Sequence, residues 1–223
     1  FEREAIRAHA FGRFEDMLLA VETHAAMLFY LDNIRSIGPN STLGRRQAAR
    51  RNDRGLNENL AREILELHTL GVNGGYTQGD VVALAKLLTG WSIDPGLAYF
   101  RFALERHEPG TKVLLGHRYA GQGFEDGRAA LRQLARHTAT AEHLATKLTR
   151  HFVSDDPPQV AVAQIAQVFR ETEGDLAEVA RAIIQLEAAW EHPFAKIRTP
   201  DDLVTAMARA LGYTEDAQAL VGT

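Results

Sequence analysis

The chain has 223 residues, 45% of them apolar and 24% charged, which is enough to bury a sizeable core. Its formal net charge is -4, from 25 Lys and Arg against 29 Asp and Glu, so no overall charge draws it to nucleic acid or to an anionic membrane surface. It has no cysteine, which excludes disulfides, zinc thiolates and a cysteine nucleophile, and it has no apolar run long enough to span a membrane.

Helical periodicity dominates the N-terminal part. From Phe14 onward, apolar residues recur at spacings of three and four. The pattern stops after Asp32, and residues 33–56 are rich in Gly, Asn and Arg. We predict a long loop for 33–56, and loops of this length inside a domain are usually functional or disordered.

Two helices follow this loop. The first is predicted from about Glu58 to Leu70, ended by Gly71. The second runs from Gln78 to about Thr89, after a capping box in the preceding turn. It is apolar nearly all round, so we expect it to be central and buried.

The middle of the chain has a different pattern. Residues 98–118 alternate and turn at Pro109-Gly110, which predicts one small β-hairpin with His107 and Glu108 beside its turn. Helical patterns then resume, and Thr199 followed by Pro200 is the clearest helix start. The chain is therefore predicted to be mostly α, a single-domain array over 1–223 of about eight to ten helices with this one hairpin.

The helix from Glu58 carries carboxylates and a histidine, which at first sight resemble a metal site. A helix turns about 100° per residue, so four polar residues share one face within an arc of about 140°: Asn59, Arg62, Glu63 and Glu66. His68 lies about 200° from Glu66, on the apolar side, so one metal ion cannot take both as ligands. We predict no metal site, and we interpret His68 as a core histidine with one hydrogen-bond partner. The polar stripe is either a solvated face joined by ion pairs or the lining of an interior cleft.

A second group of candidates lies at the predicted hairpin. An imidazole and a carboxylate in one loop can exchange protons or bind a ligand, although hairpin ends are commonly only polar. If the hairpin faces the acidic stripe across a concave pocket, the catalytic candidates are Glu63, Glu66 and His107. The binding candidates are then Asn59, Arg62, Glu108 and Lys112. No cofactor motif accompanies them, so no cofactor is predicted.

The predicted loop 33–56 contains a run of basic residues: Arg45, Arg46, Arg50, Arg51 and Arg54. Such a run could bind phosphate or nucleic acid. However, no aromatic residues for base stacking lie in it, and the chain as a whole is acidic. We therefore favour a solvated loop, or one that pairs with an acidic partner, and expect no nucleic-acid partner.

Several long segments together resemble one bacterial family, the one described as domain of unknown function 1800. Residues 55–91, "GLNENLAREILELHTLGVNGGYTQGDVVALAKLLTGW", are similar to its signature. Other similar segments follow in order, at 27–41, 107–116, 137–158, 174–184 and 194–204. The resemblance implies that the chain is the C-terminal half of a protein about twice as long, which agrees with its abrupt start inside a helical pattern.

The resemblance implies a setting but no reaction. Family members often look exported, which points to a periplasmic or exported protein whose signal is not in this chain. Their genes often neighbour those of a secreted sulfatase-like family, which makes such a co-encoded protein the expected partner. Our first hypothesis is a helical scaffold or binding module of the cell envelope that acts with a partner. The alternative is a hydrolase-type enzyme that uses Glu63 and Glu66 with His107.

Overall fold

The computed structural model describes residues 1–49, 55–94, 96–97, 99–191, 197 and 199–213. The helices are α1 (Phe14–Glu22), α2 (Ala25–Tyr30), α3 (Thr42–Ala49), α4 (Asn59–Glu63), α5 (Gln78–Leu88), α6 (Phe124–Ala135), α7 (Thr138–Phe152), α8 (Gln159–Glu171), α9 (Leu176–Gln185), α10 (Ala188–Glu191) and α11 (Pro200–Ala210). The strands are β1 (Trp91–Ile93), β2 (Phe100–Phe102), β3 (Lys112–Leu114) and β4 (His117–Tyr119). The prediction of a mostly α protein is confirmed.

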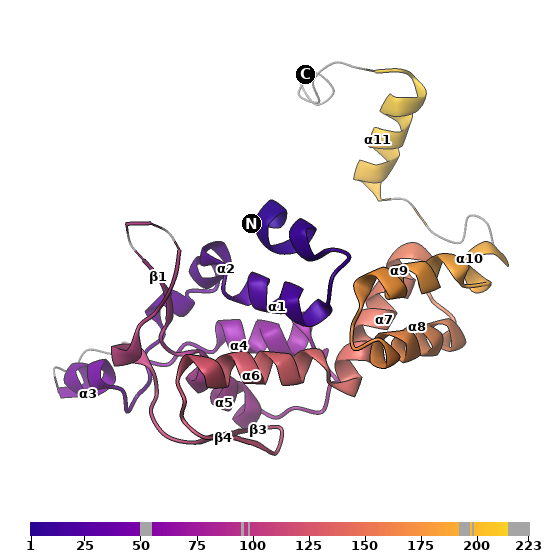
Figure 1. Ribbon diagram of the computed structural model, residues 1–223. Coiled ribbons are helices and arrows are strands. Elements are labelled where there is room, and N and C mark those ends of the chain that lie inside the picture. Colours follow the sequence, from indigo (N-terminus) through magenta and orange to yellow (C-terminus); the bar gives the residue numbers. More distant parts are fainter. Residues whose placement is uncertain (50–54, 95, 98, 192–196, 198, 214–223) are drawn as a thin grey trace.

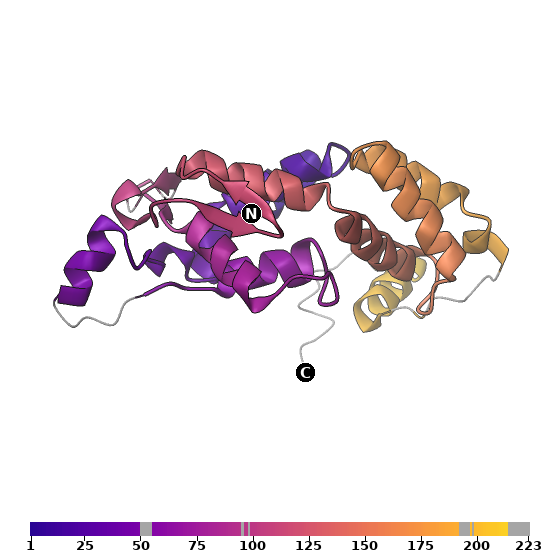
Figure 2. The same cartoon turned by 90° about the horizontal axis from the view of Figure 1, so that it is seen from below.

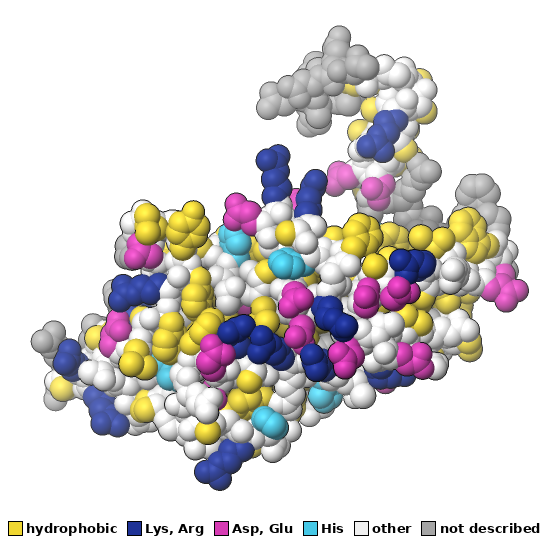
Figure 3. Space-filling view, viewed as in Figure 1, with side chains coloured by type: hydrophobic (Ala, Val, Ile, Leu, Met, Phe, Trp, Pro, Cys, Tyr) yellow, Lys and Arg dark blue, Asp and Glu magenta, His cyan; other side chains and the backbone are white. Residues whose placement is uncertain are grey.

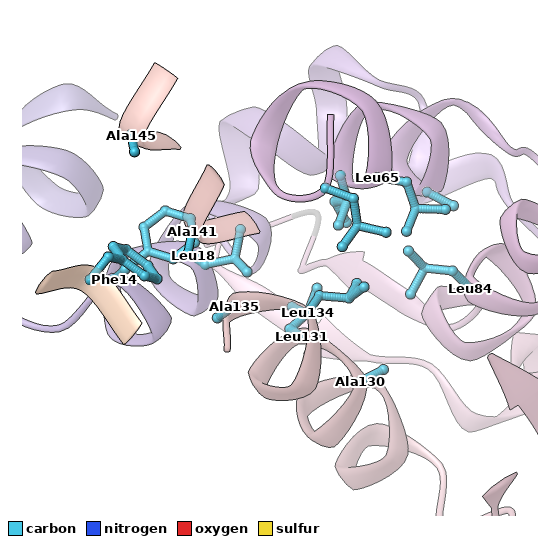
Figure 4. Close-up of a cluster of buried hydrophobic side chains, with 14 of the residues drawn as sticks. Phe14, Leu18, Leu65, Leu84, Ala130, Leu131, Leu134, Ala135, Ala141 and Ala145 are labelled. Atoms are coloured by element: carbon cyan, nitrogen blue, oxygen red, sulfur yellow. The ribbon is translucent and has the colours of Figure 1, made fainter. Parts of the chain in front are cut away.

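The elements form a larger and a smaller group. In Figures 1 and 2, α1 to α6 and the strands lie together, and α7 to α9 pack as a helical group beside them. One connected cluster of buried side chains joins the two groups. Figure 4 shows part of it, with Phe14 and Leu18 of α1 near Ala141 of α7 and with Leu131 and Leu134 on α6. The assignment of 1–223 to one domain stays a prediction.

Helix α5 is central, as its composition predicts. Its apolar side chains are at most 1% exposed at five positions: Val81, Leu84, Ala85, Leu87 and Leu88. The predicted capping box is present, because the Thr77 hydroxyl accepts from the Asp80 N–H at 3.3 Å and the Asp80 carboxylate accepts from the Thr77 N–H at 2.8 Å. The same carboxylate accepts from the Leu115 N–H at 2.7 Å, which ties the turn between β3 and β4 to the start of α5.

The helix predicted from Glu58 to Leu70 changes type half way. Helix α4 passes into a π-helical turn, η4 (Ile64–His68). Gly71, at φ +83°, follows this turn, and an added Cβ would lie 2.7 Å from the His143 ring. Only glycine therefore suits this position, for both its backbone angle and the close approach of α7.

Two hairpins take the place of the one predicted near 98–118. Strand β1 pairs with β2 and β3 pairs with β4, both antiparallel, whereas β2 and β3 are not paired. Pro109-Gly110 is therefore not a hairpin turn, and that prediction was wrong. The second hairpin turns at Leu115-Gly116, both with positive φ (47° and 75°), which is the two-residue geometry that suits twisted strands. Leucine is so rare in this conformation that the sequence does not reveal the turn.

The segment 33–56 is not a loop throughout, which corrects the expectation for it. A short turn covers Asn33–Arg35, and α3 covers Thr42–Ala49. The Asn33 amide donates to the carbonyls of Leu88 and Trp91 at 3.2 and 3.0 Å, which fixes the segment beneath the end of α5. Three of the five arginines, Arg50, Arg51 and Arg54, lie outside the described residues.

Helix α11 differs from the other long helices. Its predicted start is confirmed, because the Thr199 hydroxyl accepts from the Asp202 N–H at 3.2 Å. None of its residues is buried, and it stands apart in Figure 1. No helix of the described residues is both long and apolar enough to cross a membrane.

Candidate functional site

A buried polar network lies where the end of α5 meets the segment 106–112. Thr89 is its centre. The Thr89 carbonyl accepts from the His107 Nδ1–H at 2.8 Å, and the Thr89 hydroxyl accepts from the Glu108 N–H at 2.8 Å. The same hydroxyl donates to the Lys86 carbonyl at 2.6 Å. Thr89 thus donates to a carbonyl of the last turn of α5 and holds His107 and Glu108 beside the end of this helix.

These bonds determine the chemical state of His107. Because Nδ1 donates to a carbonyl, Nε2 carries the lone pair, and it accepts from Lys112 Nζ at 3.2 Å. His107 and Lys112 are each only 5% exposed. Burial lowers the pKa of His107, and the Lys112 charge lowers it further. Burial also lowers the pKa of Lys112. The imidazole is therefore neutral near pH 7, in a fixed tautomer.

Glu108 joins the network to the segment before α3. Its carboxylate accepts from the Asn40 N–H at 2.8 Å and from Asn40 Nδ2 at 2.6 Å, and its carbonyl accepts from Lys112 Nζ. Gly38 makes this approach possible, because a Cβ there would lie 2.6 Å from the Glu108 backbone. The Gly38 N–H donates to the Arg106 carbonyl at 2.9 Å, so the two segments are held at both ends of the contact.

Asp126, in the first turn of α6, holds the third segment. Its Oδ2 accepts from the N–H groups of Gly121 and Gln122 at 2.6 and 2.8 Å. Asp126 is 5% exposed. Burial, and to a smaller extent the charge of Asp126, raises the pKa of Tyr119 to about 12. Hydrogen bonds thus join the segments 38–45 and 102–110 to each other and hold the segment 121–123 on the start of α6.

A pocket of about 650 Å³ opens between these three segments. Its lining comprises Asn40, Ser41, Thr42, Arg45, Phe102, Leu104, His107, Pro109, Gly110, Gly121, Gln122 and Gly123. The volume falls in the range of small-ligand sites, roughly 300–1,000 Å³. Its polar groups come from all three segments.

The residues of the acidic stripe do not line this pocket, and its charged side chains form ion pairs with one another. Arg62 bonds Glu58 at 3.3 Å and Glu66 at 3.2 Å, and Gln78 donates to Glu58 at 2.8 Å. The side chains are partly exposed, at 40% for Arg62 and 28% for Glu66. Asn59 is exposed and Glu63 is half-buried. This arrangement has the ion pairs expected of a solvated helix face.

The structure therefore brings together only part of the predicted set. His107, Glu108 and Lys112 meet, but they are buried in a network and do not project from a hairpin end. Within the described residues, no hydrogen bond or ion pair joins His107 to Glu63 or Glu66, and neither glutamate lines the pocket that His107 lines. Sequence reasoning missed Thr89, which the pattern marked only as a helix end, and Asn40 and Asp126, which carried no signal of their own.

A second buried pair joins α1 to the π-helical turn. His68 Nδ1 lies 2.8 Å from Glu22 Oε1, so the predicted single partner of His68 is found, although its side chain is 27% exposed. The Glu22 side chain is 0% exposed, and its Oε2 has no partner among the described residues. Burial raises the pKa of Glu22. Burial alone would lower the pKa of His68, but the bond to Glu22 and its charge raise it.

No group of three or more His, Cys, Asp or Glu side chains in the described part of the chain is arranged to hold a metal ion. Charges are also mixed on the surface. On the face in Figure 3, Lys and Arg side chains lie among Asp and Glu side chains. The absence of a nucleic-acid partner stays a prediction.

The fold and the network define a mostly helical protein with a polar pocket fixed by internal hydrogen bonds. The chain belongs to the family described as "Protein of unknown function (DUF1800)", whose profile matches residues 1–223. The resemblance expected from the segments around 55–91 is thereby confirmed. No curated protein and no solved structure matches the chain.

Proposed function

We propose that this chain is a non-catalytic binding module that receives a polar group of a partner in the pocket beside His107. The observation that carries the proposal is the way the walls are built. Each of the three segments is anchored by buried or partly buried hydrogen bonds to Thr89, Glu108 or Asp126. A site held this way needs little ordering when a ligand binds, which favours affinity.

The same bonds favour binding over catalysis. A general base needs a free lone pair within reach of its substrate, and both ring nitrogens of His107 are engaged inside the protein. The hydrolase alternative also needs Glu63 or Glu66 beside that ring, and the pocket contains neither. No observation favours the alternative, and we do not propose it further.

The proposed setting is the cell envelope, and the proposed partner is the co-encoded sulfatase-like protein. Both come from the family resemblance. The protein would act as a helical scaffold that presents one pocket to this partner. This agrees with the exposure of Arg45 and Arg46 on α3, which could pair with an acidic surface.

Binding of the purified chain to the sulfatase-like protein, measured by calorimetry, tests the proposal. Thr42→Trp should fill the pocket, because Thr42 is exposed and lines it. We expect this variant to bind the partner on the order of tenfold more weakly. The matched control is Thr138→Trp, since Thr138 is also exposed and is also the first residue of a helix, α7. If the wild-type chain forms no complex with the sulfatase-like protein, the partner assignment is wrong. If Thr42→Trp binds as tightly as the wild type, the pocket is not the binding site.

A further inference from the structure

We infer that the group bound in this pocket is a carboxylate carried next to an apolar residue, as in an acidic segment of a partner protein. The inference rests on the proposed function and adds the chemical class of the ligand. It depends on three properties of the lining residues: their charge, their unused donors and their apolar wall.

The charge of the lining residues is positive. Of the twelve, only Arg45 and His107 can carry a charge, and His107 is neutral in its network. Arg45 therefore supplies the one formal charge of the lining. Two carboxylates that are not in the lining bond residues of it: Glu108 accepts two hydrogen bonds from Asn40, and Asp126 accepts two from the N–H groups of Gly121 and Gln122. Lys112, within the same network, offsets part of their charge.

Three side chains of the lining can donate hydrogen bonds that no other described residue uses. Arg45 is exposed, and its guanidinium makes no hydrogen bond or ion pair with another described residue. The Thr42 hydroxyl and the Gln122 side-chain amide likewise have no partner in the described part of the chain. An ionised carboxylate only accepts hydrogen bonds, and a guanidinium can bind both of its oxygens at once. The donors left over by folding thus match a carboxylate.

The remaining wall is apolar. Phe102, Leu104 and Pro109 line it, and Leu104 is 70% exposed although its neighbour Ala103 is buried. An apolar side chain adjacent to the carboxylate would cover Leu104. A small inorganic anion would leave this wall in water. The two halves of the lining therefore favour a peptide that carries an acidic and an apolar residue side by side.

Two dipeptides test this inference by NMR titration of the labelled chain: acetyl-Leu-Glu-amide and acetyl-Leu-Gln-amide. They differ only in the charge of the second side chain. We expect the glutamate peptide to shift amide signals of residues 40–45 and 121–123 and to bind in the millimolar range. We expect the glutamine peptide to bind on the order of tenfold more weakly.

Protein variants locate the charge. Arg45→Gln should weaken the glutamate peptide on the order of tenfold and leave the glutamine peptide unchanged. Arg46→Gln is the matched control, because Arg46 is the next residue of α3, is exposed and does not line the pocket. Both residues are exposed, so the variants should fold, and the amide spectrum checks this.

The outcomes separate the inference from the proposed function. Equal binding of the two peptides would overturn the carboxylate and leave the pocket as a binding site. An equal loss in Arg45→Gln and Arg46→Gln would also overturn it, since any positive charge on α3 would then suffice. If neither peptide shifts the amide signals of the pocket, the result counts against the pocket as a binding site. If the partner protein nevertheless binds, and Thr42→Trp weakens that complex, only the ligand class is wrong.

Discussion

His107 and His68 each bond a fully buried residue, Thr89 and Glu22 respectively, and their surroundings differ in one respect. Around His107 every nitrogen of the ring is paired, and the neighbouring lysine and glutamate are paired as well. At His68 the partner Glu22 is fully buried, and one of its oxygens has no partner among the described residues. A closed network makes a rigid wall, whereas a half-satisfied pair keeps a cost that depends on its protonation.

The difference arises from what each site can offer. Thr89, His107 and Glu108 meet where chain segments cross outside regular helices, so backbone carbonyl and N–H groups are free to join the network. Glu22 is the last residue of α1 and faces the packed core. Its carboxylate lies at the negative end of that helix, where a negative charge is unfavourable, and among the described side chains only His68 bonds it.

The largest effect is expected from His68→Phe. The change removes the one hydrogen-bond partner of a buried carboxyl group, and we expect the free energy of unfolding to fall by about 3 kcal/mol. Urea denaturation at pH 7, followed by circular dichroism, measures it.

The double variant Glu22→Leu/His68→Phe is the control for this cost. It replaces both polar groups by apolar ones of similar size, so its stability should return to within about 1 kcal/mol of the wild type. If the double variant were as unstable as His68→Phe alone, the loss would come from packing and not from the unpaired carboxyl group.

A smaller loss of folding stability is expected for Lys112→Met, in the network around His107. The methionine keeps the apolar part of the side chain and leaves His107 Nε2 and the Glu108 carbonyl without their donor. Two buried acceptors then lack a partner, which should cost about 2 kcal/mol in the same denaturation experiment. Lys86→Met serves as the control, since Lys86 is only half-buried, and it should stay within about 0.5 kcal/mol. Equal losses would show that Lys112 acts through its charge alone.

The stability that the Glu22–His68 pair contributes should also change with pH. The pKa values of both Glu22 and His68 are raised from their usual 4.5 and 6.5, so the folded chain keeps protons that the unfolded chain releases. Stability from the pair is therefore complete below pH 4.5 and is lost as the pH rises through the folded pKa values, the higher of which lies above 6.5.

The same double variant isolates this effect. We expect the stability of the wild type, relative to Glu22→Leu/His68→Phe, to decrease steadily between about pH 5 and pH 8. The charges of Glu63 and Lys147 also act on His68, in opposite directions, and their action belongs to the measured difference because the double variant lacks His68. A difference that is flat with pH would contradict the raised pKa values.

Helix starts and the central helix could be predicted from the sequence because their causes are local. The capping box before α5, the cap of α11 and the apolar run in α5 each need only a few adjacent residues. The hairpins could not, because their turn depends on Leu115 in a conformation that leucine rarely adopts.

The pocket needed contacts that sequence spacing does not report. His107, Glu108 and Lys112 were recognised as a group, but their burial depends on Gly38 and Asn40, which approach from the distant segment before α3. Helical phase separates His68 from Glu66, and the two bond different partners, but phase cannot identify Glu22, which lies 46 residues earlier in the chain. Local sequence patterns thus predicted the helices, whereas the polar sites depend on contacts between segments that are distant in the sequence.

The smallest effect is expected on the acidic stripe, and it separates a solvated face from a functional one. Arg62→Gln removes the ion pairs to Glu58 and Glu66, which are partly exposed, so the free energy of unfolding should change by only about 0.5 kcal/mol. Raising the salt concentration should shrink this difference further, since exposed charges are screened. Binding of the glutamate dipeptide should be unchanged, because Arg62 does not line the pocket. A loss of several kcal/mol that salt does not reduce would mean that the stripe is covered in the working protein, and attention would then move from the pocket beside His107 to the face formed by Asn59, Glu63 and Glu66.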